Sequence, residues 1–292
     1  MRGVRGAAVA IALSVALTGC QVAASDPVVP SAPVVAESPA SASPSGSPAT
    51  PGPSASATSA TAAPTPTMSP TQDALPLAGR TIVIDPGHNG VWTKRELRKV
   101  PSGNGRSKEC NSSGTATNAG YAEHAYNWAQ ANALAKELRA RGATVRLTRP
   151  NDHGEGPCVN LRSALANELK ADALVSIHAD GSFASGARGF HVIVSTTMVG
   201  GSAVEKESTA LAKRLRRALE TETAMPRSTY IGGGTALSFR NDLGTLNLSK
   251  RTAVMLEMGN MRHATDAALL GSAKFRTQAA RAIADGLEAY LG

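Results

Sequence analysis

The chain has 292 residues, of which 42% are hydrophobic and 18% charged, and its formal net charge is +8, so its length permits one large domain or two small ones. Its ten aromatic residues begin only at Trp92, and twelve of its seventeen prolines lie between Pro27 and Pro76, which excludes one uniform globule over the whole length. No apolar run reaches the roughly 20 residues that a transmembrane helix needs, which excludes a protein that spans the membrane several times.

The first segment of the chain has the features of an export signal. Arg2 and Arg5 precede an apolar run over residues 7–17, which is long enough for a secretory signal and too short to cross a bilayer. The run ends in Leu-Thr-Gly-Cys20, which resembles the bacterial lipobox, where the cysteine receives a lipid. We expect a lipoprotein-type signal peptide over 1–19, which exports the protein to the outer face of the cytoplasmic membrane, the periplasm or the cell wall. The alternative is an ordinary cleaved signal with an incidental cysteine.

Residues 20–78 are rich in Ala, Ser, Thr and Pro and contain only three charged residues, Asp26, Glu37 and Asp73. Because this composition lacks helical or strand periodicity, we expect a disordered tether. It either lets a membrane-anchored domain reach a layer outside the membrane or is a spacer of no particular reach.

The remaining part of the chain is basic. When the three acidic residues of the tether and the two N-terminal arginines are left out, residues 79–292 have a formal net charge of +9. This charge suits an anionic cell-wall polymer or lipid head groups, and an exported protein is not expected to bind nucleic acid.

Two further cysteines indicate a disulfide. If Cys20 carries a lipid, Cys110 and Cys158 remain, in an oxidising compartment where disulfides persist. Neither has a Cys or His partner at the spacing of a zinc finger, so a metal role is the weaker interpretation.

The rest of the chain alternates between strand and helix patterns. A β-branched run over 81–84, stopped by Asp-Pro-Gly, predicts a buried strand, and apolar residues at helical spacing predict a helix over 123–140. Further elements are expected as strands over 144–148, 173–177, 190–195 and 253–257, and as helices over 161–169, 204–219 and up to Tyr290. This alternation predicts an α/β sheet that helices cover on both faces.

Polar side chains stand near the ends of these predicted strands. His88, His178 and Glu257 each follow an apolar run, and ligand sites in α/β sheets gather at the carboxyl ends of strands. Two histidines and a carboxylate such as Glu123 are a common catalytic zinc ligand set, and a further carboxylate can move protons. Spacing alone does not define such a site, because no His-Glu-x-x-His motif is present and a strand-end histidine is often a hydrogen-bonded surface residue.

Five motifs stand in order along this part of the chain: Ile84-Asp85-Pro86-Gly87-His88, Glu123 at a helix start, Leu161-Arg162 with Ala166-Asn167, Ala171 to Asp180 around His178, and Met255-Leu256-Glu257-Met258-Gly259-Asn260. Together they resemble the zinc-dependent N-acetylmuramoyl-L-alanine amidases of bacterial cell walls. The resemblance covers residues 79–292 and implies a single α/β domain with a mostly parallel twisted sheet. It implies Zn²⁺ ligands at His88, Glu123 and His178 and a catalytic glutamate at Glu257.

The resemblance is not complete around these residues. Asn89 stands where the family usually has Gly, and Asp180 where it usually has Asn. The surroundings of Glu123 fit the family pattern loosely, which leaves His124 as an alternative ligand. The remaining histidines match no motif and are interpreted as structural or exposed residues: His153, His191 and His263.

The function that the resemblance implies is hydrolysis of the amide bond between N-acetylmuramic acid and the L-alanine of the peptidoglycan stem peptide. The sequence does not define the oligomeric state, and a monomer is our expectation. Two other classes stay open. A zinc carboxypeptidase-like peptide hydrolase would need a site for a terminal carboxylate, which the sequence does not reveal. A non-catalytic peptidoglycan-binding lipoprotein would have no chemical reason to keep His88, His178 and Glu257.

The loop over 91–119 separates the first two expected ligands. Its 29 residues include six basic side chains, Lys94, Arg95, Arg98, Lys99, Arg106 and Lys108. Because long ordered loops are usually functional, we predict that a Cys110–Cys158 bridge pins its base while its basic middle stays mobile and gates or grips the substrate. The alternative is an insertion held only for stability.

Overall fold

The computed structural model describes residues 75–292, and the structural statements below concern that range. The signal over 1–19, Cys20 and the tether up to residue 74 lie outside the described residues, so these assignments stay predictions. Leu77, which the sequence analysis placed in the tether, is fully buried, and its backbone N–H donates to the carbonyl of Arg141. Within 75–292 no helix combines the length and the apolar character that crossing a membrane requires.

Six strands form the main sheet, in the order β4-β1-β5-β8-β6-β7. Their bounds are β1 (Thr81–Pro86), β4 (Thr144–Leu147), β5 (Ala173–Asp180), β6 (His191–Ser195), β7 (Leu237–Arg240) and β8 (Ala253–Asn260). Four of the five neighbouring pairs are parallel, and only β6 and β8 run antiparallel. The mostly parallel sheet of the prediction is therefore confirmed, with β7 as an additional edge strand.

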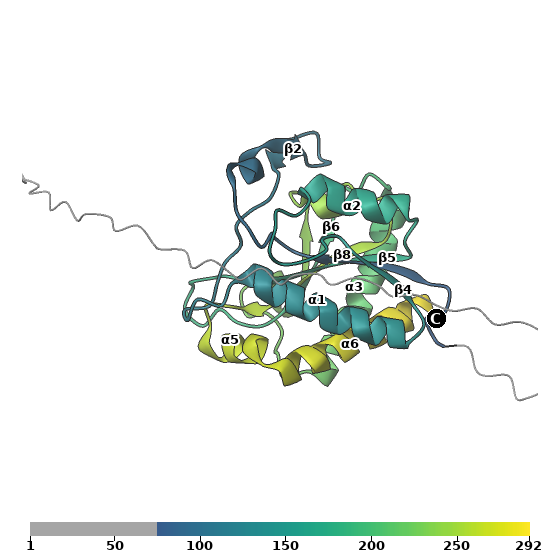
Figure 1. Ribbon diagram of the computed structural model, residues 1–292. Helices are drawn as coiled ribbons and strands as arrows, with labels where there is room; N and C mark the ends of the chain where they lie inside the picture. Colours follow the sequence, from purple (N-terminus) through teal and green to yellow (C-terminus); the bar gives the residue numbers. More distant parts are fainter. Residues whose placement is uncertain (1–74) are drawn as a thin grey trace, which may run out of the picture. The chain divides into compact units, whose positions relative to one another are not determined.

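Helices cover both faces of this sheet. They are α1 (Glu123–Ala140), α2 (Val159–Glu168), α3 (Ser202–Glu222), the short α4 (Gly244–Asn247), α5 (Ala264–Gly271) and α6 (Ala273–Leu291). Figure 1 shows α1 and α6 on one side of the sheet and α2 on the other. The larger core lies between the sheet and α1, α3 and α6, and a smaller core lies on the opposite face, under α2 and α4. The predicted single α/β domain is thus confirmed.

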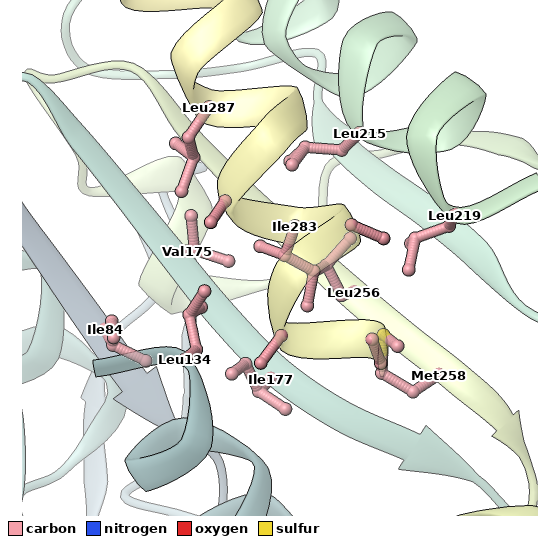
Figure 2. Packing of buried hydrophobic residues seen from close by; sticks show 14 of the residues in the cluster. Ile84, Leu134, Val175, Ile177, Leu215, Leu219, Leu256, Met258, Ile283 and Leu287 are labelled. Carbon is pink, nitrogen blue, oxygen red and sulfur yellow. The ribbon is translucent and has the colours of Figure 1, made fainter. Parts of the chain in front are cut away.

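Helix α6 packs at the centre of the larger core. Figure 2 shows its side chains Ile283 and Leu287 among Val175 of β5, Leu256 of β8 and Leu215 of α3. Ile283 and Leu287 are four positions apart, so both point to the same side of the helix. Burying two such aliphatic side chains contributes roughly 1.5–3 kcal/mol each. This packing fixes β5 and β8, the two strands that the site uses.

The loop over 91–119 contains structure that the sequence analysis did not predict. A 3₁₀ helix, η1 (Lys94–Leu97), leads into an antiparallel hairpin of β2 (Lys99–Pro101) and β3 (Ser107–Glu109). Elsewhere in the chain, a second 3₁₀ turn, η2 (Gly232–Gly234), precedes β7.

The predicted disulfide is confirmed: Cys110 and Cys158 are bonded, fully buried and 48 positions apart. Closing a span of that length stabilises the fold by about 4 kcal/mol on the chain-entropy account.

Hydrogen bonds also tie the hairpin to the segment between β7 and α4. Asn104 Nδ2 donates to the carbonyl of Asn241 at 2.7 Å, and Lys108 Nζ donates to the carbonyl of Asp242 at 3.0 Å. The buried Asn247 of α4 donates in return to the carbonyl of Ser102 at 2.7 Å. Mobility of this hairpin stays a prediction, and any opening of it has to break these bonds.

Candidate metal centre

Strand alternation places a row of polar side chains on the sheet face that α2 covers. Ile177 of β5 and Leu256 of β8 point into the larger core, so their neighbours His178 and Glu257 point to the opposite face. His178 and Glu257 are direct partners in the β5–β8 pairing, and the register shifts just beyond them. Both strands continue past these residues, so His178 and Glu257 lie inside strands and not at the strand ends where they were predicted. A shift of register beside such residues re-aims side chains locally.

The structure brings His88, Glu123 and His178 together, and we call these three the His–Glu–His cluster. Their donor atoms all lie within 4.8 Å of one another. His88 Nε2 and His178 Nδ1 are each 3.0 Å from an oxygen of Glu123, and 3.2 Å from each other. Zinc bonds of about 2.0–2.1 Å in tetrahedral geometry place neighbouring donors roughly 3.3 Å apart, so the donor set and its spacing suit such an ion.

His88 is oriented by backbone groups. It follows the turn at Gly87 and has a φ of 61°, a left-handed conformation that non-glycine residues rarely adopt and that clusters at functional sites. Its Nδ1–H donates to the carbonyl of Ser112 at 2.8 Å, which leaves the lone pair of Nε2 facing the cluster. Arg162 holds the same turn, because its guanidinium donates to the carbonyl of His88 at 2.8 Å.

Glu123 is the first residue of α1 and is almost completely buried. The backbone N–H groups of Thr115 and Ala179 donate to its two carboxylate oxygens at 3.0 and 3.2 Å. Burial opposes the charged form, but His88 and His178 beside it hold the pKa of this carboxyl well below its ordinary value. The charged carboxylate is the form that binds a cation.

A buried ion pair supports the first strand of the site. Arg162 of α2 lies 2.6 Å from Asp85 of β1, and the hydroxyl of Ser176 donates to the same carboxylate at 2.6 Å. Burial alone would raise the pKa of Asp85, but Arg162 and the hydroxyl donors hold it below its ordinary value. Arg162 also donates to Asn89 Oδ1 at 2.7 Å, while Asn89 Nδ2 donates to the buried Glu96 at 3.0 Å. Asn89, which stands where the family usually has Gly, therefore links the site to the base of the hairpin.

Glu257 is near the cluster but is not one of its three members. It lines a cavity of about 330 Å³, the site cavity, together with all three cluster residues. Its Oε2 is buried and has no hydrogen-bond partner among the described residues. Burial, together with the carboxylates of Glu123 and Asp180, raises the pKa of Glu257 well above its ordinary value. A carboxyl group of this kind is suited to taking up and returning a proton.

The other residues considered from the sequence lie outside the cluster. His124 Nδ1 is 2.9 Å from Asp152, which explains why this alternative ligand does not join the three. Asp180 lines the site cavity, accepting from the Tyr230 hydroxyl at 2.7 Å and from the N–H of Gly181 at 2.7 Å. His153 is exposed and His263 is half-buried, but His191 is buried beside Glu257.

Most of the basic loop does not face the site. Among its six basic side chains, all in the described part of the chain, only Lys108 lines the site cavity. Arg95 pairs with Glu155 at 3.0 Å and Lys99 pairs with Glu109 at 3.4 Å. The basic surface expected beside the metal centre thus reduces to one half-buried lysine.

We expect Gly114→Ala to weaken metal binding although it removes no ligand. A Cβ at Gly114 would lie 2.8 Å from Glu123 Oε2 and 2.8 Å from the His88 ring, so at least one of these two side chains has to move. Loss of ligand orientation typically lowers metal affinity about 10–100-fold. The measurement is zinc titration of the purified variant, with Gly105→Ala as matched control, because Gly105 has the same positive φ (75° against 76°) but nothing within 4 Å. Equal affinities for the two variants would contradict the expected crowding.

An α/β domain with a His–Glu–His cluster and a separate buried carboxylate at the carboxyl edge of its sheet has the architecture of a metal-dependent hydrolase. The family model for N-acetylmuramoyl-L-alanine amidase matches residues 82–289. The chain belongs to this family.

Individual relatives agree with the family match. The chain is 40% identical over 215 residues to an N-acetylmuramoyl-L-alanine amidase of Mycobacterium tuberculosis, covering 74% of this chain and 88% of the relative. A probable cell wall amidase, LytH of Staphylococcus epidermidis, is 30% identical over 74% of this chain, which spans only 60% of that protein. Among solved structures, the amidase Ami1 of Mycobacterium smegmatis superposes with a TM-score of 0.71 at 40% identity, covering 74% of this chain and 98% of Ami1.

Proposed function

We propose that this protein hydrolyses the amide bond between N-acetylmuramic acid and the L-alanine of the peptidoglycan stem peptide, and that it uses zinc. One observation supports the proposal most directly: Glu257 shares the site cavity with the His–Glu–His cluster, and one of its carboxylate oxygens has no partner within residues 75–292. Family membership supports the substrate class. The donor set of two imidazoles and one carboxylate, with room for a further ligand, is the usual one for catalytic zinc.

His88, Glu123 and His178 would hold the ion. When bound, zinc supplies a Lewis acid that polarises a carbonyl oxygen and lowers the pKa of water toward about 7. Glu257 accepts a proton from the water as its oxygen adds to the amide carbonyl carbon. The same carboxyl then donates this proton to the nitrogen of L-alanine as the carbon–nitrogen bond breaks. The products are a lactyl carboxylate on the glycan and a stem peptide with a free amino group.

Product identification combined with metal analysis tests the proposal. Purified protein is incubated with peptidoglycan, bound metal is quantified, and the released groups are identified by mass spectrometry. New L-alanine amino termini are the expected result. Release of C-terminal amino acids would identify a carboxypeptidase, and binding without any release would identify a non-catalytic wall protein. Either outcome would overturn the proposal.

Membrane attachment through Cys20 and a monomeric state are further parts of the proposal. The lipobox pattern supports attachment, and an outer location suits a family that acts on the cell wall. Cys20→Ser should move the protein from the membrane fraction to the soluble exported fraction without changing its activity on isolated peptidoglycan. Unchanged fractionation would show that Cys20 carries no anchoring lipid.

We expect Lys108→Met to weaken substrate binding with little change in kcat. Lys108 lines the site cavity, and burial lowers the pKa of its ammonium group although Asp242 opposes this effect. Stem peptides carry carboxylates, and a hydrogen bond between charged groups contributes about 1.5–3 kcal/mol, so KM should rise about 10-fold or more. Steady-state kinetics on soluble muramyl peptides measure this. Lys99→Met is the matched control, because Lys99 lies on the same hairpin but outside the cavity lining, and an equal effect there would exclude a specific contact.

A further inference from the structure

His191 occupies the position next to Glu257 in the sheet. It is the first residue of β6 and the direct partner of Glu257 in the antiparallel pairing with β8. Direct partners in such a pair point to the same face, with Cβ atoms about 4.5–5.5 Å apart. Because His178 is the partner of Glu257 on the other side, the three side chains form one row across β5, β8 and β6.

Both His191 and Glu257 have a buried atom without a hydrogen-bond partner in the described part of the chain. His191 is only 2% exposed, and its Nδ1 makes no hydrogen bond to any described residue. Glu257 Oε2 is also buried and likewise makes no hydrogen bond to any described residue. Buried polar atoms in folded proteins are nearly always hydrogen-bonded, so unpaired ones need an explanation. An imidazole N–H and a carboxylate oxygen on adjacent side chains are complementary hydrogen-bonding groups.

The surroundings fix the imidazole ring and keep it neutral. The ring meets Tyr230 edge-on, with centroids 6.4 Å apart and planes at 81°, and the Tyr230 hydroxyl is itself bonded to Asp180. Burial lowers the pKa of His191 to about 4, although Asp180 opposes this effect, so the ring is neutral near pH 7. A neutral imidazole carries one N–H, which it can donate from the nitrogen that faces a carboxylate.

We propose that His191 is a positioning residue for Glu257, donating its Nδ1–H to Oε2 and so leaving the other carboxylate oxygen to face the site cavity. This inference rests on the proposed function, because it assumes that Glu257 moves the proton. The hydrogen bond holds the carboxylate in one rotamer, so that its free oxygen meets the attacking water in a fixed place. Position matters here, because general acid–base catalysis requires hydrogen-bond reach to the proton that is transferred.

Three substitutions at His191 separate this role from a packing role. The side-chain nitrogen of Asn lies close to the place of Nδ1, whereas that of Gln lies close to the place of Nε2. His191→Leu should lower kcat about 10- to 100-fold with KM within about twofold, because a bond to a charged group is lost. His191→Asn should recover most of this loss and His191→Gln little of it. His153→Asn, at an exposed histidine, is the control and should leave the kinetics unchanged.

Bound zinc and the thermal unfolding midpoint are measured for every variant, and the three His191 variants should match wild type in zinc content. Full activity of His191→Leu, or equal recovery by Gln and Asn, would overturn the inference. Loss of zinc together with activity would also overturn it, because it would place His191 in the metal centre.

A spectroscopic measurement is independent of turnover. In protein labelled with ¹⁵N-histidine, the Nδ1–H resonance that disappears in His191→Asn should shift when Glu257 is replaced by Gln. An unmoved resonance would overturn the inference even if wild-type protein proved inactive. Inactivity of the wild type with zinc bound would instead refute the proposed function, so the two failures are distinguishable.

Discussion

Glu257→Gln is expected to lower kcat by about 10²- to 10⁴-fold while the protein keeps its metal, which is the range that general acid–base catalysis contributes. Glutamine fits the same space but cannot accept a proton at its amide oxygen and return it to the leaving amine. Glu257 lines the site cavity but stands outside the three residues whose donor atoms converge, so metal binding should not depend on it. Turnover of muramyl peptides and zinc content of the same preparation are the two measurements.

The control for this prediction is Glu109→Gln, the same chemical change on the hairpin, where the carboxylate pairs with Lys99 at the surface. It should leave kcat within about twofold of wild type. If Glu257→Gln lost its zinc, Glu257 would be a metal ligand and the assignment of its role would be wrong. Retention of both zinc and full turnover would remove it from the reaction.

The main sheet was predictable because its signals are local. The β-branched run at the start of β1 and the helical spacing of Ala131, Ala135 and Leu138 in α1 each need only a few neighbouring residues to be recognised. The strand ends were less predictable. Polar residues inside β5 and β8, His178 and Glu257, interrupt the apolar runs, so the pattern suggested that both strands end sooner than they do.

The hairpin and β7 escaped prediction because distant contacts stabilise them. The hairpin strands have three residues each and depend on the Cys110–Cys158 bridge and on the hydrogen bond from Asn247, 145 positions away from Ser102. Short segments of this kind carry no periodicity of their own. The disulfide itself was predictable, since assigning Cys20 to a lipid leaves Cys110 and Cys158 as the one possible pair.

The candidate metal centre was found from motif resemblance and not from spacing. His88 and His178 are 90 positions apart, and the sheet topology brings them together. The groups that orient His88 and Glu123 were missed, because the Ser112 carbonyl and the Thr115 N–H belong to the backbone and leave no side-chain signature. His191 was missed for a different reason: its meaning depends on the antiparallel pairing of β6 with β8, which breaks the parallel order.

His88→Ala and His178→Ala are each expected to lose zinc and activity together. Losing an outer-shell partner already lowers metal affinity about 10–100-fold, so removing a ligand should have a larger effect. Zinc titration and turnover are measured together, with His124→Ala as the control, because His124 contacts Asp152 and should keep the ion. Full zinc occupancy in either variant would remove that histidine from the metal centre. Because Glu257→Gln should keep zinc and lose turnover, while these variants should lose both, the comparison assigns binding and proton transfer to different side chains of one cavity.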